Sequence, residues 1–263
     1  MPLSIVQVDA FTNRPFAGNP AAVCVLPAPR DDAWMQKVAV EMNLSETAFL
    51  VREGDQFHLR WFTPALEVAL CGHATLASAH ALWECGHLKP GEQARFRTLS
   101  GILTADQRGE WIEMDFPVTA DEPADEPPYL SKALGAELKY VGRNNFDYIA
   151  EVKSEAVLRG LKPNHSLLSE LGARGVIVTV RGETGDFDFV SRFFAPGSGI
   201  NEDPVTGSAH CCLAPYWAKR LGKTEFLAYQ ASARGGVVRA RLNGDRVILG
   251  GQAVTVLRGE LVD

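Results

Sequence analysis

The chain has 263 residues, of which 46% are hydrophobic and 22% are charged, proportions that are ordinary for a soluble globular protein. Its formal net charge of -6 provides no basic surplus to neutralise phosphates, so nucleic-acid binding is not expected. No stretch reaches the roughly 20 apolar residues of a membrane span, so no membrane partner is expected. The length allows one large domain or two domains of moderate size.

Five cysteines are scattered along the chain, at positions 24, 71, 85, 211 and 212. An odd number of cysteines outside any CxxC pair indicates neither a disulfide framework nor a structural zinc site. The opening residues lack the basic segment and apolar run of a signal peptide and are typical of a strand. The expected setting is therefore reducing and cytoplasmic.

Residues 1–117 are predicted to form a first domain. A helix is expected from Asp31 or Asp32, which offer an N-cap, to about Met42. Residues 72–84 are nearly all apolar or small, which indicates a helix that is buried on all sides. A strand from about 253 to 263 is a candidate to complete this domain. The strands predicted within it are 5–11, 21–26, 47–52, 57–62, 95–103 and 111–116.

Residues 118–128 are acidic and rich in proline, which predicts a linker or surface crossing. A second domain is expected over 129–252, with strands near 147–152, 175–180 and 187–194. Another helix of small residues is predicted from Gly207 to Leu221, and Pro215 inside it is expected to kink it or to mark a frayed turn. Asn243-Gly244 is a strong hairpin signal.

The approaches to the two buried helices share a pattern. Residues 62–82 and residues 194–214 each run from F-x-P, through a loop that contains an acid, to a glycine and a helix of small residues. The shared order and spacing indicate a duplicated α/β unit.

The two helix starts are candidate binding elements. Gly72 and Gly207 place glycine where the backbone must approach another group closely. The exposed N–H groups and positive dipole end of a helix start favour a carboxylate. If the two starts face each other, the binding site lies in the cleft between the halves. The alternative is that Thr206 or Ser208 only caps its helix.

Three polar residues near these starts are candidate acid/base groups. Glu46 precedes an apolar strand, where a carboxylate is usually a solvated edge residue; the functional interpretation is that burial lets it accept and return a proton near neutrality. His73 stands in the first turn of the first buried helix, where the helix end disfavours the imidazolium; a neutral hydrogen-bond donor and a satisfied core histidine are equally open interpretations. Asp203 precedes a proline before the second helix, which is also ordinary turn chemistry.

Cys71 precedes Gly72 at the mouth of the first buried helix. That position is expected to lower a thiol pKa and permit proton abstraction, although buried, inert cysteine is the commoner case. The chain contains no phosphate-binding loop, no dinucleotide-binding fingerprint and no H-E-x-x-H zinc motif. The chemistry is therefore expected to come from side chains, without a cofactor or a metal.

Taken together, these segments resemble the PhzF-like family, which is named for the phenazine biosynthesis isomerase and has the diaminopimelate epimerase-like fold. The resemblance rests on VDAFTNRPFAGNPAAV at the start, EMNLSETAFL with Glu46, FTPALEVALCGHAT with Gly72 and His73, SRFFAP, and EDPVTGSA with Asp203 and Ser208. Pro215 also matches, because relatives carry a proline in the second helix. The middle of the chain, from about 123 to 172, matches only loosely.

The resemblance implies an α+β fold of two similar domains, each a barrel-like, mostly antiparallel sheet wrapped round a central helix. It implies a homodimer and a cofactor-independent isomerase that transfers a proton on a small carboxylate-bearing substrate. The glutamate equivalent to Glu46 would move the proton and the equivalents of His73 and Asp203 would assist. Substrate would be held at the two helix starts, by Gly72, Thr206, Gly207 and Ser208.

Two other functions stay open at this stage. The family's phenazine enzyme has alanine where this chain has Cys71, and a cysteine there resembles a thiol of diaminopimelate epimerase or proline racemase. Those enzymes use two opposed cysteines, and the second motif here offers Asp203 and Thr206 but no cysteine before the helix. An amino- or imino-acid epimerase using Cys71 is therefore one alternative, and a non-catalytic small-ligand-binding protein is the other.

Overall fold

A computed structural model describes residues 3–262, so Met1, Pro2 and Asp263, which the predicted domain 1–117 and the predicted strand 253–263 include, lie outside the described residues. The chain folds into two compact units. Unit 1 comprises residues 1–115 and 250–263, and unit 2 comprises residues 116–249. None of the helices in the described part of the chain is long and apolar enough to cross a membrane.

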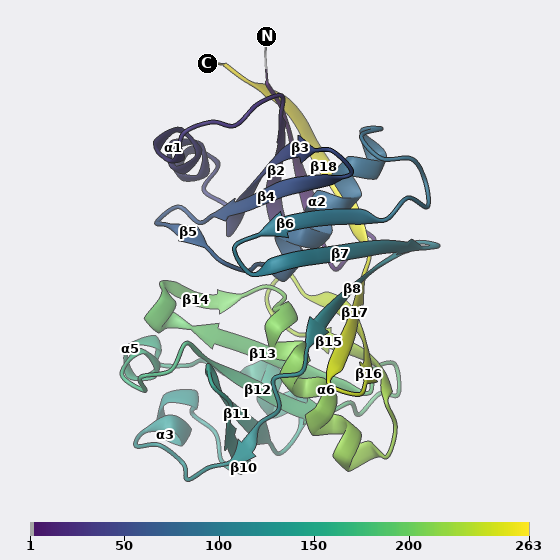
Figure 1. The fold of residues 1–263 in the computed structure, drawn as a ribbon. Helices are drawn as coiled ribbons and strands as arrows, with labels where there is room; N and C mark the ends of the chain where they lie inside the picture. The colour runs from purple at the N-terminus through teal and green to yellow at the C-terminus, as the bar shows by residue number, and fades with distance from the viewer. Residues whose placement is uncertain (1–2, 263) are drawn as a thin grey trace. The chain divides into compact units, whose positions relative to one another are not determined.

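Unit 1 is a mostly antiparallel sheet with two helices (Figure 1). Strand β1 pairs antiparallel with β2 and with β18, and β2 pairs parallel with β3. Strand β3 forms an antiparallel hairpin with β4, which also pairs with β5 and, in parallel, with β6. The elements are β1 (Leu3–Ala10), β2 (Asn19–Leu26), α1 (Asp32–Met42), β3 (Glu46–Glu53), β4 (Gln56–Phe62), β5 (Glu67–Val68), α2 (Gly72–Glu84), β6 (Ala94–Thr98), β7 (Gly101–Arg108), β8 (Trp111–Pro117) and β18 (Ala253–Leu261).

Helix α2 is the central element of unit 1, with strands around it (Figure 1). Nine of its 13 residues are buried, which confirms the prediction from its small and apolar composition. Its buried hydroxyls are satisfied within the helix, because Thr75 donates to the carbonyl of Cys71 and Ser78 donates to that of Ala74. Helix α2 is therefore a rigid support for the residues at its start.

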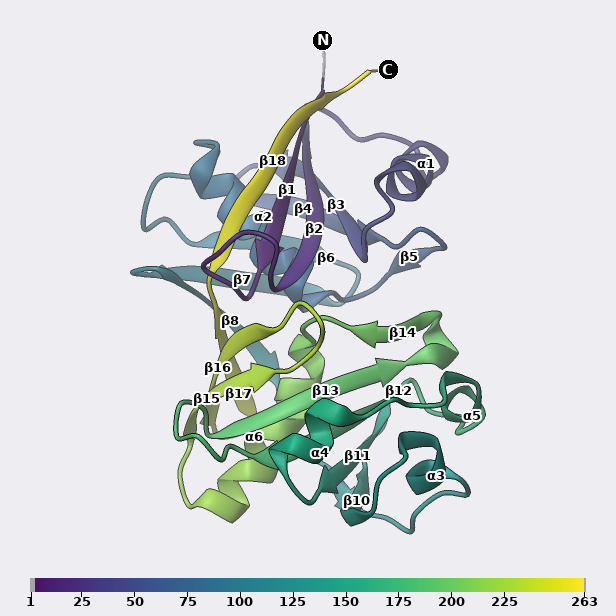
Figure 2. The ribbon, with the colours of Figure 1, turned by 180° about the vertical axis from the view of Figure 1, so that it is seen from behind.

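Seen from behind, β18 runs along β1 at the edge of unit 1 (Figure 2). The pairing extends from Leu3 opposite Leu261 to Ala10 opposite Ala253, with an irregularity between Gln7 and Val8. The last strand of the described chain thus completes the sheet that the first strand begins.

Unit 2 repeats this plan around helix α6. Its elements are β9 (Glu122–Pro123), α3 (Leu130–Leu134), β10 (Leu138–Arg143), β11 (Asp147–Val152), α4 (Glu155–Gly160), α5 (His165–Ser169), β12 (Gly175–Arg181), β13 (Phe189–Ala195), the 3-10 helix η1 (Pro196–Ser198), β14 (Ile200–Asp203), α6 (Gly207–Leu221), β15 (Glu225–Gln230), β16 (Gly236–Asn243) and β17 (Arg246–Gly251). The chain passes between the units within β8 and within β17.

The strand pairings show the duplication directly. In unit 1 the directions are antiparallel for β1–β2, parallel for β2–β3, antiparallel for β3–β4 and parallel for β4–β6. In unit 2 the same directions recur, in the same order, for β10–β11, β11–β12, β12–β13 and β13–β15. The weak repeat around the two F-x-P loops is thus one part of a repeated topology, and the predicted α+β class of two similar domains is confirmed.

Helix α6 continues through Pro215, where the sequence predicted a kink or frayed turn. Proline has no N–H, so the carbonyl of Cys211, four residues earlier, loses its helical donor. The backbone N–H of Thr119 donates to this carbonyl instead, at 3.2 Å. A neighbouring segment thus satisfies the acceptor that the proline leaves free.

One local prediction was wrong. The single strand predicted over 95–103 is a hairpin of β6 and β7, and Gly101, which has φ +95°, lies at the turn between them. Residues 118–128 are mostly exposed or half-buried, as expected of a surface crossing, and β9 within them pairs with β10.

Candidate active site

Three of the residues singled out above converge in unit 1. Glu46 is the first residue of β3, Cys71 is the N-cap of α2, and His73 is the second residue of that helix. The carboxylate oxygen Oε2 of Glu46 lies 3.0 Å from Nε2 of His73, and Sγ of Cys71 lies 3.5 Å from Nδ1 of the same ring. The three residues are only 8%, 7% and 5% exposed, respectively. Glu46 is therefore a buried, paired carboxylate and not a solvated edge residue.

The Glu46–His73 pair is close but poorly aligned. Both Glu46 Oε2 and His73 Nε2 are buried, and neither has a hydrogen-bond partner of good geometry, although 3.0 Å separates them. Buried polar atoms are nearly always satisfied, so such atoms point to a group that the site is built to receive. These two atoms are the best candidates in unit 1 for direct contact with a ligand.

Asn19, the first residue of β2, holds the far side of the His73 ring. Its Nδ2 lies 3.1 Å from His73 Nδ1, and the hydroxyl of Ser45 donates to its Oδ1 at 3.4 Å. The preceding Gly18 has φ +63°, and a Cβ there would lie 2.1 Å from the carbonyl oxygen of Ala10. Sequence reasoning missed Asn19, because it lies in the GNP segment between two predicted strands and no local pattern marks it as functional.

Burial controls the protonation of Cys71. Burial and, after it, the nearby Glu46 carboxylate raise the pKa of the thiol to about 11, against the opposing effect of the neighbouring His73. The expectation that a helix start would lower this pKa was wrong, because the loss of solvation outweighs the helix end. Cys71 is thus a neutral thiol near neutral pH.

The pKa of His73 is raised well above its ordinary value. Burial alone would lower it, but the charge interactions with Cys71 and Glu46 outweigh burial. Because Cys71 stays protonated, we attribute the effect to the Glu46 carboxylate. The helix dipole predicted a neutral histidine, whereas the surroundings of His73 favour the imidazolium.

In unit 2, Asp203 and Thr206 form a second polar cluster at the start of α6. The hydroxyl of Thr206 donates to Oδ2 of Asp203 at 2.5 Å. Gln230, fully buried at the end of β15, accepts from the backbone N–H of Thr206 at 2.9 Å and donates to the carbonyl of Asp203 at 2.8 Å. Gln230 thus fixes the loop that carries Asp203, a role that no sequence motif signalled.

Ser208, beside Gly207 in the first turn of α6, does not serve as a simple helix cap. Its Oγ accepts a hydrogen bond from Nη2 of Arg174 at 3.1 Å. Arg174 is itself held by the buried carboxylate of Asp147, and its guanidinium lies over the ring of Phe193. Thr206 is the N-cap residue but makes no side-chain cap bond, so the capping alternative is not supported for either residue.

The predicted residues thus form two clusters. Glu46, Gly72 and His73, with Cys71, lie in unit 1, whereas Asp203, Thr206, Gly207 and Ser208 lie in unit 2. Only the first cluster combines a carboxylate, a thiol and an imidazole, and their donor atoms lie within 4.8 Å of one another. This group could hold a metal ion, which the sequence did not predict.

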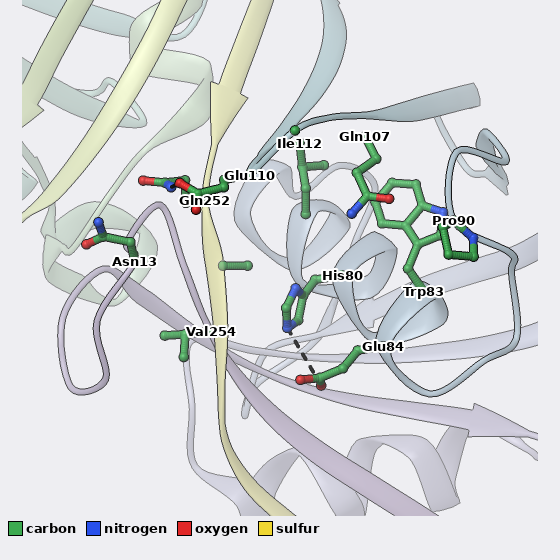
Figure 3. Close-up of a pocket in the computed structure, with 12 residues that line it drawn as sticks. Asn13, His80, Trp83, Glu84, Pro90, Gln107, Glu110, Ile112, Gln252 and Val254 are labelled. Atoms are coloured by element: carbon green, nitrogen blue, oxygen red, sulfur yellow. Dashed lines mark hydrogen bonds and ion pairs between the residues drawn. The ribbon is translucent and has the colours of Figure 1, made fainter.

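Unit 1 also contains an open cavity of about 600 Å³ that none of the predicted residues lines (Figure 3). His80 and Glu84 face each other in it, with Nε2 and Oε2 3.7 Å apart. Arg258 forms an ion pair with Glu84 at 2.9 Å, so the carboxylate is already compensated. The cavity is lined by Asn13, His80, Trp83, Glu84, Pro90, Gln107, Gly109, Glu110, Ile112, Gln252, Ala253 and Val254.

Comparison with known proteins places this arrangement in a family. The family described as "Phenazine biosynthesis-like protein" (PhzC-PhzF) matches residues 8–259. An uncharacterized isomerase of Halalkalibacterium halodurans is 60% identical over 265 residues, covering 100% of this chain and 99% of the relative.

Comparison with solved structures supports the same family. A PhzF-family phenazine biosynthesis protein from Enterococcus faecalis superposes with a TM-score of 0.96 at 43% identity, covering 100% of both chains. A predicted epimerase from Pseudomonas aeruginosa superposes with a TM-score of 0.79 at 22% identity, covering 99% of both chains, a likeness of fold alone. The fold is therefore the diaminopimelate epimerase-like fold, and the chain belongs to the PhzC-PhzF family of phenazine biosynthesis-like proteins.

Proposed function

We propose that this protein is an isomerase that moves a proton on a small carboxylate-bearing substrate, with Glu46 as the base. The observation that carries the proposal is the buried pair of Glu46 Oε2 and His73 Nε2, 3.0 Å apart and without well-aligned partners. The name of the Halalkalibacterium halodurans relative, an isomerase, supports the reaction class. The substrate class rests on the start of α2, whose N–H groups and dipole favour an anion.

The geometry gives each residue of unit 1 a role. The Glu46 carboxylate removes a proton from a substrate carbon and returns it at another position, so the reaction is an isomerisation with no net loss of a proton. If Asn19 donates to an unprotonated Nδ1, the ring proton is on Nε2; in the imidazolium, Nε2 is protonated as well. In both states His73 offers an N–H beside Glu46, suited to stabilising negative charge that develops on the substrate. These side chains would supply the acid/base chemistry without a cofactor.

Isotope exchange in deuterated water tests this proposal. The protein is incubated with a panel of small carboxylic acids, and carbon-bound deuterium is read by mass spectrometry. Glu46→Gln keeps the shape of the side chain but removes the base, and it should lower exchange by at least about 100-fold. Glu53→Gln, at the exposed end of the same strand, is the matched control. Wild-type exchange in Glu46→Gln would exclude Glu46 as the base.

The same assay separates the two alternative functions. An epimerase that uses Cys71 requires a reactive thiol, whereas burial raises the pKa of Cys71 to about 11. Loss of exchange in Cys71→Ala, with exchange retained in Glu46→Gln, would favour that epimerase. Tight binding of an acid without any exchange in the wild-type protein would favour a non-catalytic binding protein.

The assignment of Asp203, Thr206, Gly207 and Ser208 to the same substrate stays a prediction from the resemblance. The homodimer also stays a prediction. Sedimentation of the full chain at several concentrations would test the oligomeric state directly.

A further inference from the structure

The unit 1 cluster has a donor set that its acid/base role does not need. Proton transfer requires a carboxylate and a hydrogen-bond donor, which Glu46 and His73 supply. Cys71 adds a buried sulfur 3.5 Å from the same imidazole. Carboxylate, imidazole and thiolate are three of the ligands that Zn²⁺ prefers, whereas Mg²⁺ and Ca²⁺ prefer oxygen alone.

The spacing of these groups suits a tetrahedral ion. Zn²⁺ binds sulfur at about 2.3 Å and nitrogen or oxygen at about 2.0–2.2 Å, so its donors lie about 3.3–3.7 Å apart. One donor atom from each of Glu46, Cys71 and His73 lies within 4.8 Å of the others. Glu46 Oε2 lies 3.0 Å from Nε2 of His73, and Cys71 Sγ lies 3.5 Å from Nδ1 of the same ring. Because these are different ring nitrogens, a shared ion requires the Cys71 or His73 side chain to rotate until one nitrogen faces both partners.

A second observation supports a ligand at this point. Glu46 Oε2 and His73 Nε2 are both buried and lack a well-aligned hydrogen-bond partner. An ion between them would satisfy both atoms, which polar atoms at this depth require.

We propose that Glu46, Cys71 and His73 form a site for one Zn²⁺ ion, and that Zn²⁺ bound there inhibits the protein. The ion replaces the thiol proton of Cys71 and the proton on the coordinating nitrogen of His73, and both protons are released to solvent. Coordination also occupies the carboxylate that would act as base. Zn²⁺ binding stands on the geometry of the cluster, whereas inhibition rests on the function proposed above.

Zn²⁺ titration of the full-length, metal-stripped protein against a chromophoric chelator measures binding without substrate. The wild-type protein should bind one equivalent, and Cys71→Ala should bind at least about tenfold more weakly, since even supporting residues of metal sites contribute that much. Cys85→Ala and His80→Ala are the controls, because these residues lie at the other end of α2, where His80 and the exposed Cys85 could hold adventitious zinc. Both controls should bind as the wild type does.

Cobalt spectroscopy covers the case in which Cys71→Ala perturbs the fold. Co²⁺ bound to the wild-type protein should show a thiolate-to-metal charge-transfer band, which Cys85→Ala retains and Cys71→Ala lacks. Equal Zn²⁺ affinity in wild-type and Cys71→Ala proteins, a loss confined to the Cys85 or His80 variants, or an absence of saturable binding would each overturn the site. Deuterium exchange that persists in Glu46→Gln would overturn the proposed function and leave the binding result unaffected.

Discussion

The carboxamide of Asn19 and the imidazole of His73 meet at 3.1 Å, on the side of the ring away from Glu46. Asn19 is fully buried at the start of β2, and His73 stands in the first turn of α2. The ring is thus held from one side by an amide that does not titrate, while its other nitrogen faces the carboxylate. This contact fixes the plane of the ring and, with it, the direction of the Nε2–H group.

Replacing Asn19 with leucine should slow catalysis with little effect on substrate binding. The variant keeps the volume but loses the hydrogen bond to Nδ1, and a neutral hydrogen bond contributes about 0.5–1.5 kcal/mol, or about 2- to 10-fold in rate. Steady-state kinetics should therefore show a lower kcat with KM nearly unchanged. Asn13→Leu, at an exposed position in the loop between β1 and β2, is the control. An equal loss in both variants would assign the effect to general destabilisation.

The buried thiols should resist alkylation near neutral pH. Burial raises the pKa of Cys71 to about 11 and the pKa of Cys24 and Cys212 to about 12, whereas Cys85 is exposed. Iodoacetamide reacts with thiolates, so Cys85 should be modified first. Peptide mass spectrometry over a time course at pH 7.5 measures the order of modification. If Cys71 were modified as fast as Cys85, the site would contain an activated thiol.

Stability should fall at mildly acidic pH because of His210. Burial lowers the pKa of this histidine from 6.5 to about 4, against the opposing effect of its hydrogen bond to the carbonyl of Thr206. The unfolded chain takes up a proton near pH 6.5 and the folded chain only near pH 4, so the free energy of unfolding decreases between these values as pH falls. The loss amounts to about 3 kcal/mol.

Urea unfolding at several pH values would measure this dependence. His210→Asn keeps a donor for the Thr206 carbonyl but does not titrate, so its stability should depend less on pH between 6.5 and 4. His87→Asn, at an exposed position, should reduce the dependence less than His210→Asn does. Identical pH profiles for the wild-type and His210→Asn proteins would show that other groups control the acid response.

Gln230→Leu should destabilise unit 2 and displace the loop before α6. The substitution leaves the N–H of Thr206 and the carbonyl of Asp203 without their partner, and each buried unsatisfied group costs roughly 1–3 kcal/mol. The free energy of unfolding, measured in urea, should decrease by roughly 2–6 kcal/mol in all. Gln107→Leu, at an exposed position, should change it by less than about 0.5 kcal/mol. A small effect of Gln230→Leu would mean that the loop is held by other contacts.

Much of the fold could be predicted because composition marks its central elements. Helix α2 and helix α6 have the predicted bounds, since each begins at a glycine and continues as a run of small and apolar residues that is buried. Residues 123–172 gave weaker signals, because α3, α4 and α5 are each no longer than six residues and have no periodicity to detect.

The candidate site was predicted in part, and the unpredicted part depends on tertiary contacts. Glu46 and His73 lie close together as expected, since motif and resemblance marked both residues. Asn19 and Gln230 could not be recognised, because an amide has chemical meaning here only through partners that are distant in the sequence. The protonation of Cys71 and His73 was predicted with the wrong sign, because the helix end was visible in the sequence and the depth of burial was not.

The pairing of β18 with β1 affects how the protein can be made. Strand β18 leaves the ribosome only after all of unit 2 has been synthesised, so the nascent chain carries an open edge along β1 during that time. Unit 2 is a continuous segment that can fold first, whereas unit 1 must wait for its final strand. Newly made chains are therefore open to strand exchange with one another, and a truncation before residue 253 would leave this edge permanently unpaired.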